Sequence, residues 1–233
     1  MQRKIFMKIT WLGQAGLLFY NGKVKIMVDP YLSDCVKNAE PNNFRRIPID
    51  ESLFKIEPDV MIFTHDHLDH YDPETAPRFL SRQDKKMTVL CPTSVWQKAR
   101  KNGGGHNYVE FNRHTEWTEY GFCFRAVKAA HSEPFAIGVI IEELETEKIY
   151  YITGDTLYNE DVFSDLPDGI EVVFLPVNGV GNNMNATDAA RFAKRCGAKY
   201  AVPYHVSMFD EKTPDIFDAE NKIVLEIYEE REI

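Results

Sequence analysis

Apolar and polar positions alternate at the start of the chain with the two-residue period of β-strands. Three runs of this kind open the sequence, and we expect them to be strands: Lys8–Leu12, Ala15–Tyr20 and Lys23–Val28. The pair Asn21-Gly22 lies between the last two runs and is typical of the type I′ turn in a two-residue hairpin loop. The pattern therefore predicts that the chain begins with an antiparallel hairpin.

The periodicity disappears between Pro30 and Pro48, and this stretch predicts a long loop. Loops of this length in compact domains are usually functional or disordered, so we expect a rim or a lid here. The stretch contains Arg45 and Arg46, whose guanidinium groups suit recognition of a phosphate or a carboxylate. A solvated pair of charges explains the same residues, and the sequence leaves both interpretations open.

Strands and helices alternate through the rest of the chain. Apolar runs predict nine more strands, at Val60–Thr64, Met87–Cys91, Tyr108–Phe111, Phe122–Ala129, Ile137–Glu142, Lys148–Thr153, Val172–Pro176, Tyr200–Tyr204 and Lys222–Tyr228. Capping residues and periodicity predict helices at Glu74–Arg82, Thr93–Asn102 and Thr187–Cys196. Since no repeat or linker interrupts this order, we expect one α+β or α/β domain over residues 1–233, with two mixed sheets and helices outside them.

The composition narrows the classes of partner. The 233 residues include 27 Lys and Arg against 36 Asp and Glu, which gives a net charge of −9, and 44% are hydrophobic. A globular chain of this size buries a core without disulfides or structural metals, so any metal it binds is expected to be functional. The negative balance disfavours nucleic acid and anionic membranes as partners. Much of it falls in Glu142–Glu147 and Glu226–Glu232, which we expect to face solvent.

The cysteines and the first residues suggest a compartment. The four cysteines have no CxxC spacing, and we expect them to be free thiols: Cys35, Cys91, Cys123 and Cys196. The segment Met1–Met7 has no apolar run of the kind found in secretory signals. These features favour a cytoplasmic protein that does not bind membranes.

Five potential metal ligands lie within six residues, directly after one predicted strand. The segment His65-Asp66-His67-Leu68-Asp69-His70 follows Val60–Thr64. In extended backbone His65 and His67 project to the same side and can ligate one ion, while Asp69 and His70 could hold a second. A histidine-rich surface loop is the alternative, but so many ionisable groups beside an apolar strand would repel or desolvate one another without a cation. The segment therefore predicts a metal site.

Three further candidate ligands each follow an apolar strand. His131 follows Phe122–Ala129, Asp155 follows Lys148–Thr153, and His205 follows Tyr200–Tyr204. Each residue alone is more typical of a turn than of a ligand. Their shared position at strand ends favours a common cleft, because residues from several strands can meet there.

The ligands in this order resemble the full series of the metallo-β-lactamase superfamily: His65-x-His67-x-Asp69-His70, then His131, Asp155 and His205. Asp29 is similar to the acidic residue that ends the early hairpin in this superfamily and supports a ligand. Finer similarities in Ile9–Gly16, Thr64–His70 and Asn178–Ala190 indicate the branch of L-ascorbate-6-phosphate lactonase-like hydrolases, which is related to N-acyl-phosphatidylethanolamine phospholipase D.

This resemblance implies a four-layer αβ/βα sandwich with metals at the sheet edges. It implies that the first ion is held by His65, His67 and His131, the second by Asp69, His70 and His205, with Asp155 bridging both and Asp29 supporting a histidine. Two divalent ions lower the pKa of a shared water toward about 7, and Asp69 and Asp155 are the candidate catalytic residues. Nitrogen and carboxylate ligands without thiolate favour zinc or manganese and are compatible with iron.

The function implied is hydrolysis of a lactone, ester or phosphodiester bond in a small, anionic metabolite. Candidate substrate residues are Arg45 and Arg46, together with Asn182 and Asn183 in the Gly/Asn-rich loop before the helix Thr187–Cys196. One alternative is a di-iron oxidoreductase of the same fold, in which a glutamate usually stands at the position of His67. The other is a nucleic-acid-processing phosphodiesterase, which needs a basic surface. By analogy with the branch, a homo-oligomer is compatible with this interpretation.

Overall fold

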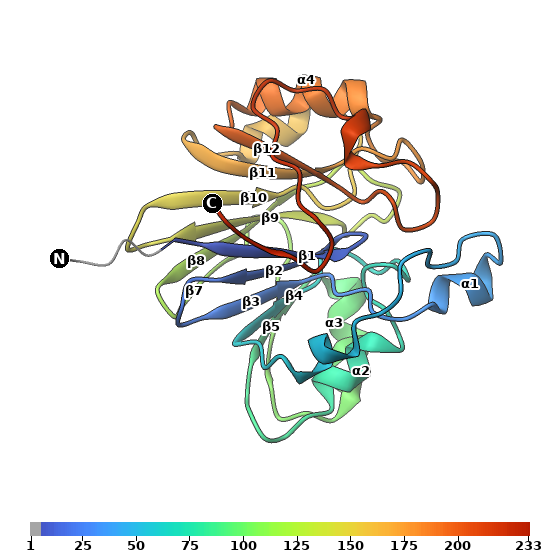
Figure 1. Ribbon diagram of the computed structural model, residues 1–233. Helices are drawn as coiled ribbons and strands as arrows, with labels where there is room; N and C mark the ends of the chain where they lie inside the picture. The colour runs from blue at the N-terminus through green and yellow to red at the C-terminus, as the bar shows by residue number, and fades with distance from the viewer. Residues whose placement is uncertain (1–5) are drawn as a thin grey trace.

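Two β-sheets form the inner layers of the protein (Figure 1). The structure is a computed structural model that describes residues 6–233. The first sheet has seven strands in the order β13-β1-β2-β3-β4-β5-β6. Their bounds are β1 (Lys8–Gly13), β2 (Gly16–Tyr20), β3 (Lys25–Val28), β4 (Val60–Ile62), β5 (Thr88–Cys91), β6 (Asn107–Glu110) and β13 (Glu230–Glu232). Strands β1 to β3 are antiparallel, whereas β3 to β6 run parallel.

The second sheet has six strands in the order β12-β11-β10-β9-β8-β7. Their bounds are β7 (Glu116–Glu119), β8 (Phe122–Lys128), β9 (Ile137–Glu143), β10 (Lys148–Ile152), β11 (Ile170–Pro176) and β12 (Tyr200–Tyr204). Strands β10 to β12 are parallel, and β9 is antiparallel to both of its neighbours. Both sheets are therefore mixed, as the sequence predicts.

Helices cover the outer faces of the two sheets (Figure 1). Helices α2 (Thr75–Leu80) and α3 (Thr93–Ala99) lie on the first sheet, α4 (Ala186–Cys196) lies on the second, and the short α1 (Cys35–Ala39) projects at one side. Single 3₁₀ turns occur at Glu51–Lys55, Arg100–Asn102, Glu160–Asp165 and Pro214–Ile216. The predicted four-layer sandwich is confirmed.

The main core fills the space between the sheets. The ring of Phe19 on β2 meets two rings of the second sheet edge to face, with centroid distances of 5.8 Å to Tyr150 and 5.4 Å to Phe174. A second cluster packs the outer face of the first sheet against α2 and α3, with Met61 and Phe79 fully buried. Close packing of both faces holds the strand ends in fixed positions.

Helix capping follows the sequence signals. The Asp72 carboxylate accepts hydrogen bonds from the backbone N–H groups of Glu74 and Thr75 at the start of α2, at 2.8 and 3.1 Å. The Asn185 side chain accepts from Asp188 N at 2.9 Å at the start of α4, and Gly197 ends that helix with φ 69°. No helix within residues 6–233 has both the length and the apolar character needed to cross a membrane.

Four local predictions are wrong. Strands β2 and β3 pair Tyr20 with Lys25, so their loop is longer than a two-residue turn, and the Asn21 side chain accepts from the N–H groups of Lys23 and Val24 instead. The segment Lys222–Tyr228 makes only isolated bridges, and the last strand is β13. The expected loop between Pro30 and Pro48 contains α1, and β7 was not predicted at all.

One acidic residue of the expected exposed turn is buried. Glu143 is only 2% exposed, because it accepts hydrogen bonds from Asn21 Nδ2 and Thr146 Oγ1, each at 2.7 Å. The four cysteines are free thiols, as predicted. Residues 1–5 of the segment Met1–Met7 lie outside the described part of the chain.

Candidate metal centre

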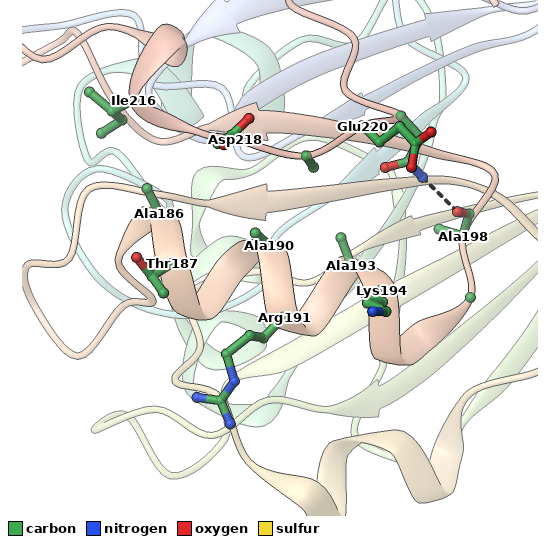
Figure 2. Close-up of a pocket in the computed structure, with 13 residues that line it drawn as sticks. Ala186, Thr187, Ala190, Arg191, Ala193, Lys194, Ala198, Ile216, Asp218 and Glu220 are labelled. Atoms are coloured by element: carbon green, nitrogen blue, oxygen red, sulfur yellow. Dashed lines mark hydrogen bonds between the residues drawn. The ribbon is translucent and has the colours of Figure 1, made fainter.

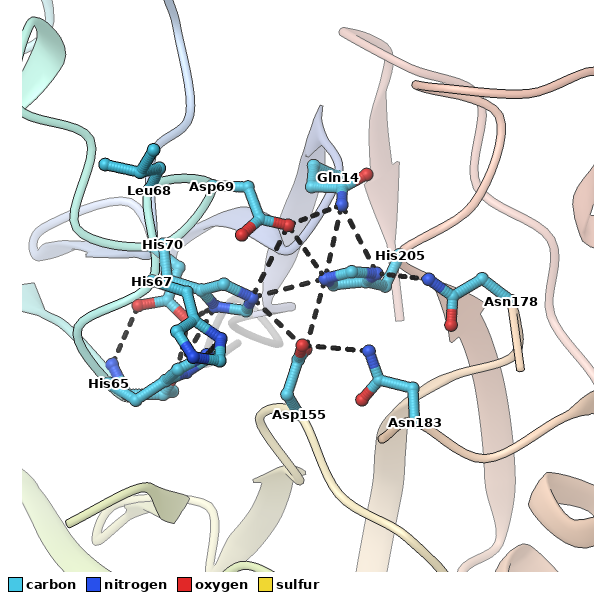
Figure 3. Close-up of polar contacts among 12 residues, drawn as sticks. Gln14, His65, His67, Leu68, Asp69, His70, Asp155, Asn178, Asn183 and His205 are labelled. Carbon is cyan, nitrogen blue, oxygen red and sulfur yellow. Dashed lines mark hydrogen bonds and ion pairs between the residues drawn. The ribbon is translucent and has the colours of Figure 1, made fainter. Parts of the chain in front are cut away.

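Strand ends from both sheets deliver the predicted ligands to one edge of the sandwich (Figure 3). The segment His65–His70 follows β4 of the first sheet, while His131 follows β8, Asp155 follows β10 and His205 follows β12 of the second. Strands β8, β10 and β12 run in the same direction, so their carboxyl ends share one edge. The seven side chains form two groups, within each of which the potential ligand atoms lie within 4.8 Å of one another.

Three histidine rings form the first group together with Asp155. Nδ1 of His67 lies 3.0 Å from Nε2 of His65 and 3.2 Å from Nε2 of His131. Zinc–nitrogen bonds of 2.0–2.1 Å in a tetrahedral arrangement require a spacing of about 3.3 Å between ligand atoms. The spacing of these nitrogens therefore matches a shared cation.

The second group consists of Asp69, His70 and His205. The Nε2 atoms of the two histidines are 3.2 Å apart. Oδ2 of Asp69 lies 3.3 Å from Nε2 of His205 and 4.0 Å from Nε2 of His70. Two nitrogens and one carboxylate oxygen thus surround a second point at ligand spacing.

Asp155 lies between the two groups. Its Oδ1 atom is 3.1 Å from Nε2 of His70 and 3.1 Å from Nε2 of His205, while the residue also belongs to the first histidine group. Oδ1 is buried without a hydrogen bond, whereas Oδ2 accepts from Asn183 Nδ2 at 2.8 Å. A buried carboxylate oxygen without a hydrogen bond is costly unless a cation compensates it. The residues present therefore fit two divalent ions with Asp155 between them.

Asp29 holds one of the ligand histidines from behind. This fully buried carboxylate follows β3, and its Oδ2 atom lies 2.8 Å from Nδ1 of His70. Thr64 fixes the carboxylate in turn, because its backbone N–H donates to Oδ1 at 2.8 Å and its hydroxyl donates to Oδ2 at 2.5 Å. Such a contact leaves the other ring nitrogen, Nε2, directed at the centre of the site.

Burial and neighbouring charges set the protonation states. Burial lowers the pKa of His65 well below its ordinary value, and the nearby His70 lowers it further. Burial would also lower the pKa of His70, but Asp155 and Asp29 outweigh it and raise that pKa. Burial would raise the pKa of Asp155, whereas His205 and His70 hold it well below its ordinary value. An ionised Asp155 beside a neutral His65 is the form that can bind a cation.

Gln14 is a site residue that sequence analysis missed. Its side-chain amide donates to Asp69 Oδ2 at 2.7 Å and lies 3.2 Å from Nε2 of His205 (Figure 3). The residue is 2% exposed with φ 49°, and its backbone oxygen accepts from Trp11 Nε1 and His205 N, both at 2.9 Å. The sequence signal for Gln14 is a polar residue in the short turn between two apolar strands.

The two arginines donate hydrogen bonds to backbone oxygens of other segments. Arg45 donates to the backbone oxygen of Tyr31 at 2.6 Å and to the hydroxyl of Tyr228 at 2.7 Å, so its guanidinium holds the loop to the C-terminal segment. Arg46 donates to Phe209 O at 3.1 Å and is exposed. Neither arginine is among the residues that line the cavity beside the candidate ligands, so a role in gripping substrate stays a prediction.

A cavity of about 360 Å³ opens in front of the ligands, and Asn182 and Asn183 both line it. Asn183 is 5% exposed, because its side chain binds Asp155 and accepts from Thr156 N at 3.0 Å. The backbone oxygen of Asn182 lies 3.4 Å from Nδ1 of His131. Asn183 therefore orients the bridging carboxylate, whereas the sequence suggested contact with substrate.

A larger cavity of about 770 Å³ runs along α4 (Figure 2). Figure 2 shows alanines of the helix facing Asp218 and Glu220 across the cavity, whereas Arg191 points away from those two residues. No histidine or cysteine is among the residues that line it. Four of the seven candidate ligands line the smaller cavity instead: His67, Asp69, Asp155 and His205.

Comparison with known proteins agrees with the fold. The Beta-lactamase superfamily domain matches residues 25–206, and the chain belongs to this family. A UPF0173 metal-dependent hydrolase from Enterococcus faecalis is 30% identical over 84% of this chain and 85% of that protein. A UPF0173 protein from Pyrococcus furiosus is 26% identical over 92% of this chain and 90% of its own length.

A solved structure with a similar backbone is that of a possible metal-dependent hydrolase from Veillonella parvula. Its TM-score is 0.76 with 16% sequence identity, and the match covers 98% of this chain and all of the other, 100%. The protein therefore has the metallo-β-lactamase fold, and it carries two clusters of histidine and aspartate that could hold metal.

Proposed function

We propose that this protein is a metal-dependent hydrolase that uses two divalent ions to direct water at a lactone, ester or phosphodiester bond of a small molecule. The observation that carries the proposal is the position of Asp155 Oδ1, which is buried without a hydrogen bond and lies 3.1 Å from a nitrogen of each of two histidines. Curated relatives named metal-dependent hydrolases, which match over most of their length, support the same class of activity.

The ligands define how the chain would hold the ions. His65, His67 and His131 would bind the first ion, the group of Asp69, His70 and His205 the second, and Asp155 both. Zinc or manganese suits this set of nitrogen and carboxylate ligands, and iron is compatible with it. When bound, such a pair lowers the pKa of a shared water and polarises an oxygen of the substrate.

Proton transfer falls to Asp69 in this proposal. The Gln14 amide holds one oxygen of the Asp69 carboxylate at 2.7 Å, and this restricts its rotation at the cavity wall. A carboxylate fixed there can orient the attacking water, take up its proton and return that proton to the leaving oxygen. Tyr204 is fully buried and does not line the cavity, so it cannot serve as the acid.

Loading the purified protein separately with zinc, manganese and iron tests the proposal. Each form would be assayed against simple lactones, p-nitrophenyl esters and bis(p-nitrophenyl) phosphate, with metal content measured by elemental analysis. We expect two ions per chain and hydrolysis of at least one of these substrates. Two bound ions without hydrolysis of any of them would contradict the proposed activity, and oxygen consumption by the iron form would favour the oxidoreductase alternative.

A pair of matched variants tests whether the hydrolysis comes from this protein or from a contaminant. Asp155→Asn is expected to abolish the activity, because a neutral amide cannot bridge two cations. Asp161→Asn changes an aspartate whose partner is Lys128 at 3.0 Å on the protein surface, and it should retain full activity. Equal activity in both variants would show that the hydrolysis comes from elsewhere.

A further inference from the structure

The cavity beside the candidate ligands is lined without lysine or arginine among the described residues. Glu40 on its rim adds a negative charge. An anion bound away from the metals therefore has no cationic partner among these residues. Proteins that bind phosphate or carboxylate groups commonly supply arginine, lysine or a helix N-terminus.

Apolar side chains form much of the wall instead. Those that line the cavity are Val36, Ala39, Leu68, Val180 and Phe209. Two of them are conspicuously exposed, with Leu68 at 38% and Val180 at 59%. Leu68 lies next to the ligand Asp69, and Val180 lies in the loop after β11 that also carries Asn183. Exposed apolar side chains gathered at a concave site favour an apolar ligand.

Positive side chains close to the cavity are already engaged. Lys212 donates to the backbone oxygen of Asn178 at 2.7 Å and lies 3.8 Å from Asp210. Arg46 donates to Phe209 O and lies 3.6 Å from Glu211. Recruiting either cation to a substrate would require it to leave these partners.

We propose that the substrate is an uncharged carboxylic ester or lactone whose apolar part lies against Leu68 and Val180. This inference rests on the proposed hydrolase function and replaces the anionic metabolite expected from the sequence. Its reacting carbonyl would face the metal ligands, and water would add across the acyl–oxygen bond to give a carboxylic acid and an alcohol.

One series of p-nitrophenyl esters and one matched charged ester test this inference with the zinc- or manganese-loaded protein. Along acetate, propionate, butyrate and pentanoate, we expect kcat/KM to rise about three- to fourfold for each methylene buried. The matched charged substrate is mono-p-nitrophenyl glutarate, in which a carboxylate replaces the terminal methyl of the pentanoate. We expect it to react at least tenfold more slowly than the pentanoate, and an equal or faster rate would overturn the inference.

Substitutions in the cavity wall test whether the substrate contacts this pocket or responds only to the overall surface charge. Val180→Lys places a cation in the wall and is expected to reduce the pentanoate-to-glutarate ratio about tenfold. Leu144→Lys introduces the same charge at an exposed leucine, 46% accessible, in the turn between β9 and β10, and it should leave the ratio unchanged. An equal change in both variants would mean that this wall does not contact the substrate.

Binding of hexanamide gives a result that does not depend on turnover. In ¹³C-methyl-labelled protein, we expect hexanamide to shift the methyl signals of Leu68 and Val180 and to leave that of Leu144 in place. The matched anion, adipamate, should shift them far less at the same concentration. If hexanamide shifts these signals but no ester is hydrolysed, the proposed hydrolase activity is contradicted and the apolar binding site is supported. If esters are hydrolysed with a preference for the glutarate ester, the hydrolase activity is supported and the uncharged, apolar substrate is contradicted.

Discussion

Asp155 lies between the two groups of candidate ligands and would join them into one metal centre. One carboxylate oxygen lies between His70 and His205, and Asn183 holds the other at 2.8 Å. Asp155→Ala should remove the anion that separates two cations, so we expect loss of at least one of the two metal equivalents as well as activity. Elemental analysis after dialysis measures this loss. An unchanged metal content would refute the bridging role.

Gln14 is expected to act by positioning Asp69. Gln14→Ala removes the hydrogen bond to Asp69 Oδ2, and losing a partner of a ligand typically weakens metal affinity 10–100-fold. We expect a fall of about this size in the affinity of the more weakly bound ion, measured by competition with a chelator, and a lower kcat at similar KM. Gln83→Ala changes an exposed glutamine and is the matched control. Unaltered affinity and kcat in Gln14→Ala would show that Asp69 needs no such support.

Site residues that follow strands were easier to predict than site residues in loops. The ligands after β4, β8, β10 and β12 were found because an apolar run followed by His or Asp is visible in the sequence. Gln14 and Asn183 were missed or given another role, because contacts with Asp69 and Asp155 depend on the approach of segments far apart in the chain. Likewise β7 has alternating exposure with Trp117 as its main apolar residue, which gives little pattern to detect.

The 3₁₀ turn Glu160–Asp165 is tied to the strand that leads to His131. Asp165 accepts from Arg113 Nε at 2.6 Å and from the backbone N–H of Lys128, the last residue of β8, at 2.9 Å. The hydrogen bond from Arg113 holds the pKa of Asp165 well below its ordinary value. The stabilisation is therefore present above the unfolded-state pKa of this carboxyl, near 3.8, and is lost as the pH falls through the lower folded-state pKa.

Asp165→Asn should therefore lower the free energy of unfolding by about 1–2 kcal/mol at pH 7, with a smaller difference below pH 4. Denaturant titration at several pH values measures it. Asp161→Asn, which breaks only the exposed contact with Lys128, should change stability by less than about 0.5 kcal/mol. A difference between wild type and Asp165→Asn that does not vary with pH would contradict the assigned ion pair.

The candidate metal ligands come from both sheets, so a bound metal would link the two halves of the molecule. The segment His65–His70 belongs to the first sheet, and the other ligands follow strands of the second. Binding at 100 times the dissociation constant stabilises a protein by about 2.7 kcal/mol, which corresponds to about 5–10 °C in Tm at this size. We expect zinc to raise the Tm by that amount and EDTA to reverse it, with little effect in Asp155→Ala. A Tm unaffected by zinc would contradict a centre shared by both sheets.

The proposed mechanism requires two metal ions in this chain, one in each group of ligands. Anomalous diffraction from crystals grown with zinc, measured on both sides of the zinc absorption edge, tests this requirement. We predict two anomalous peaks, one among His65, His67 and His131 and one among Asp69, His70 and His205, with Asp155 touching both. A single peak, or no peak at these residues at full zinc loading, would contradict the dinuclear centre.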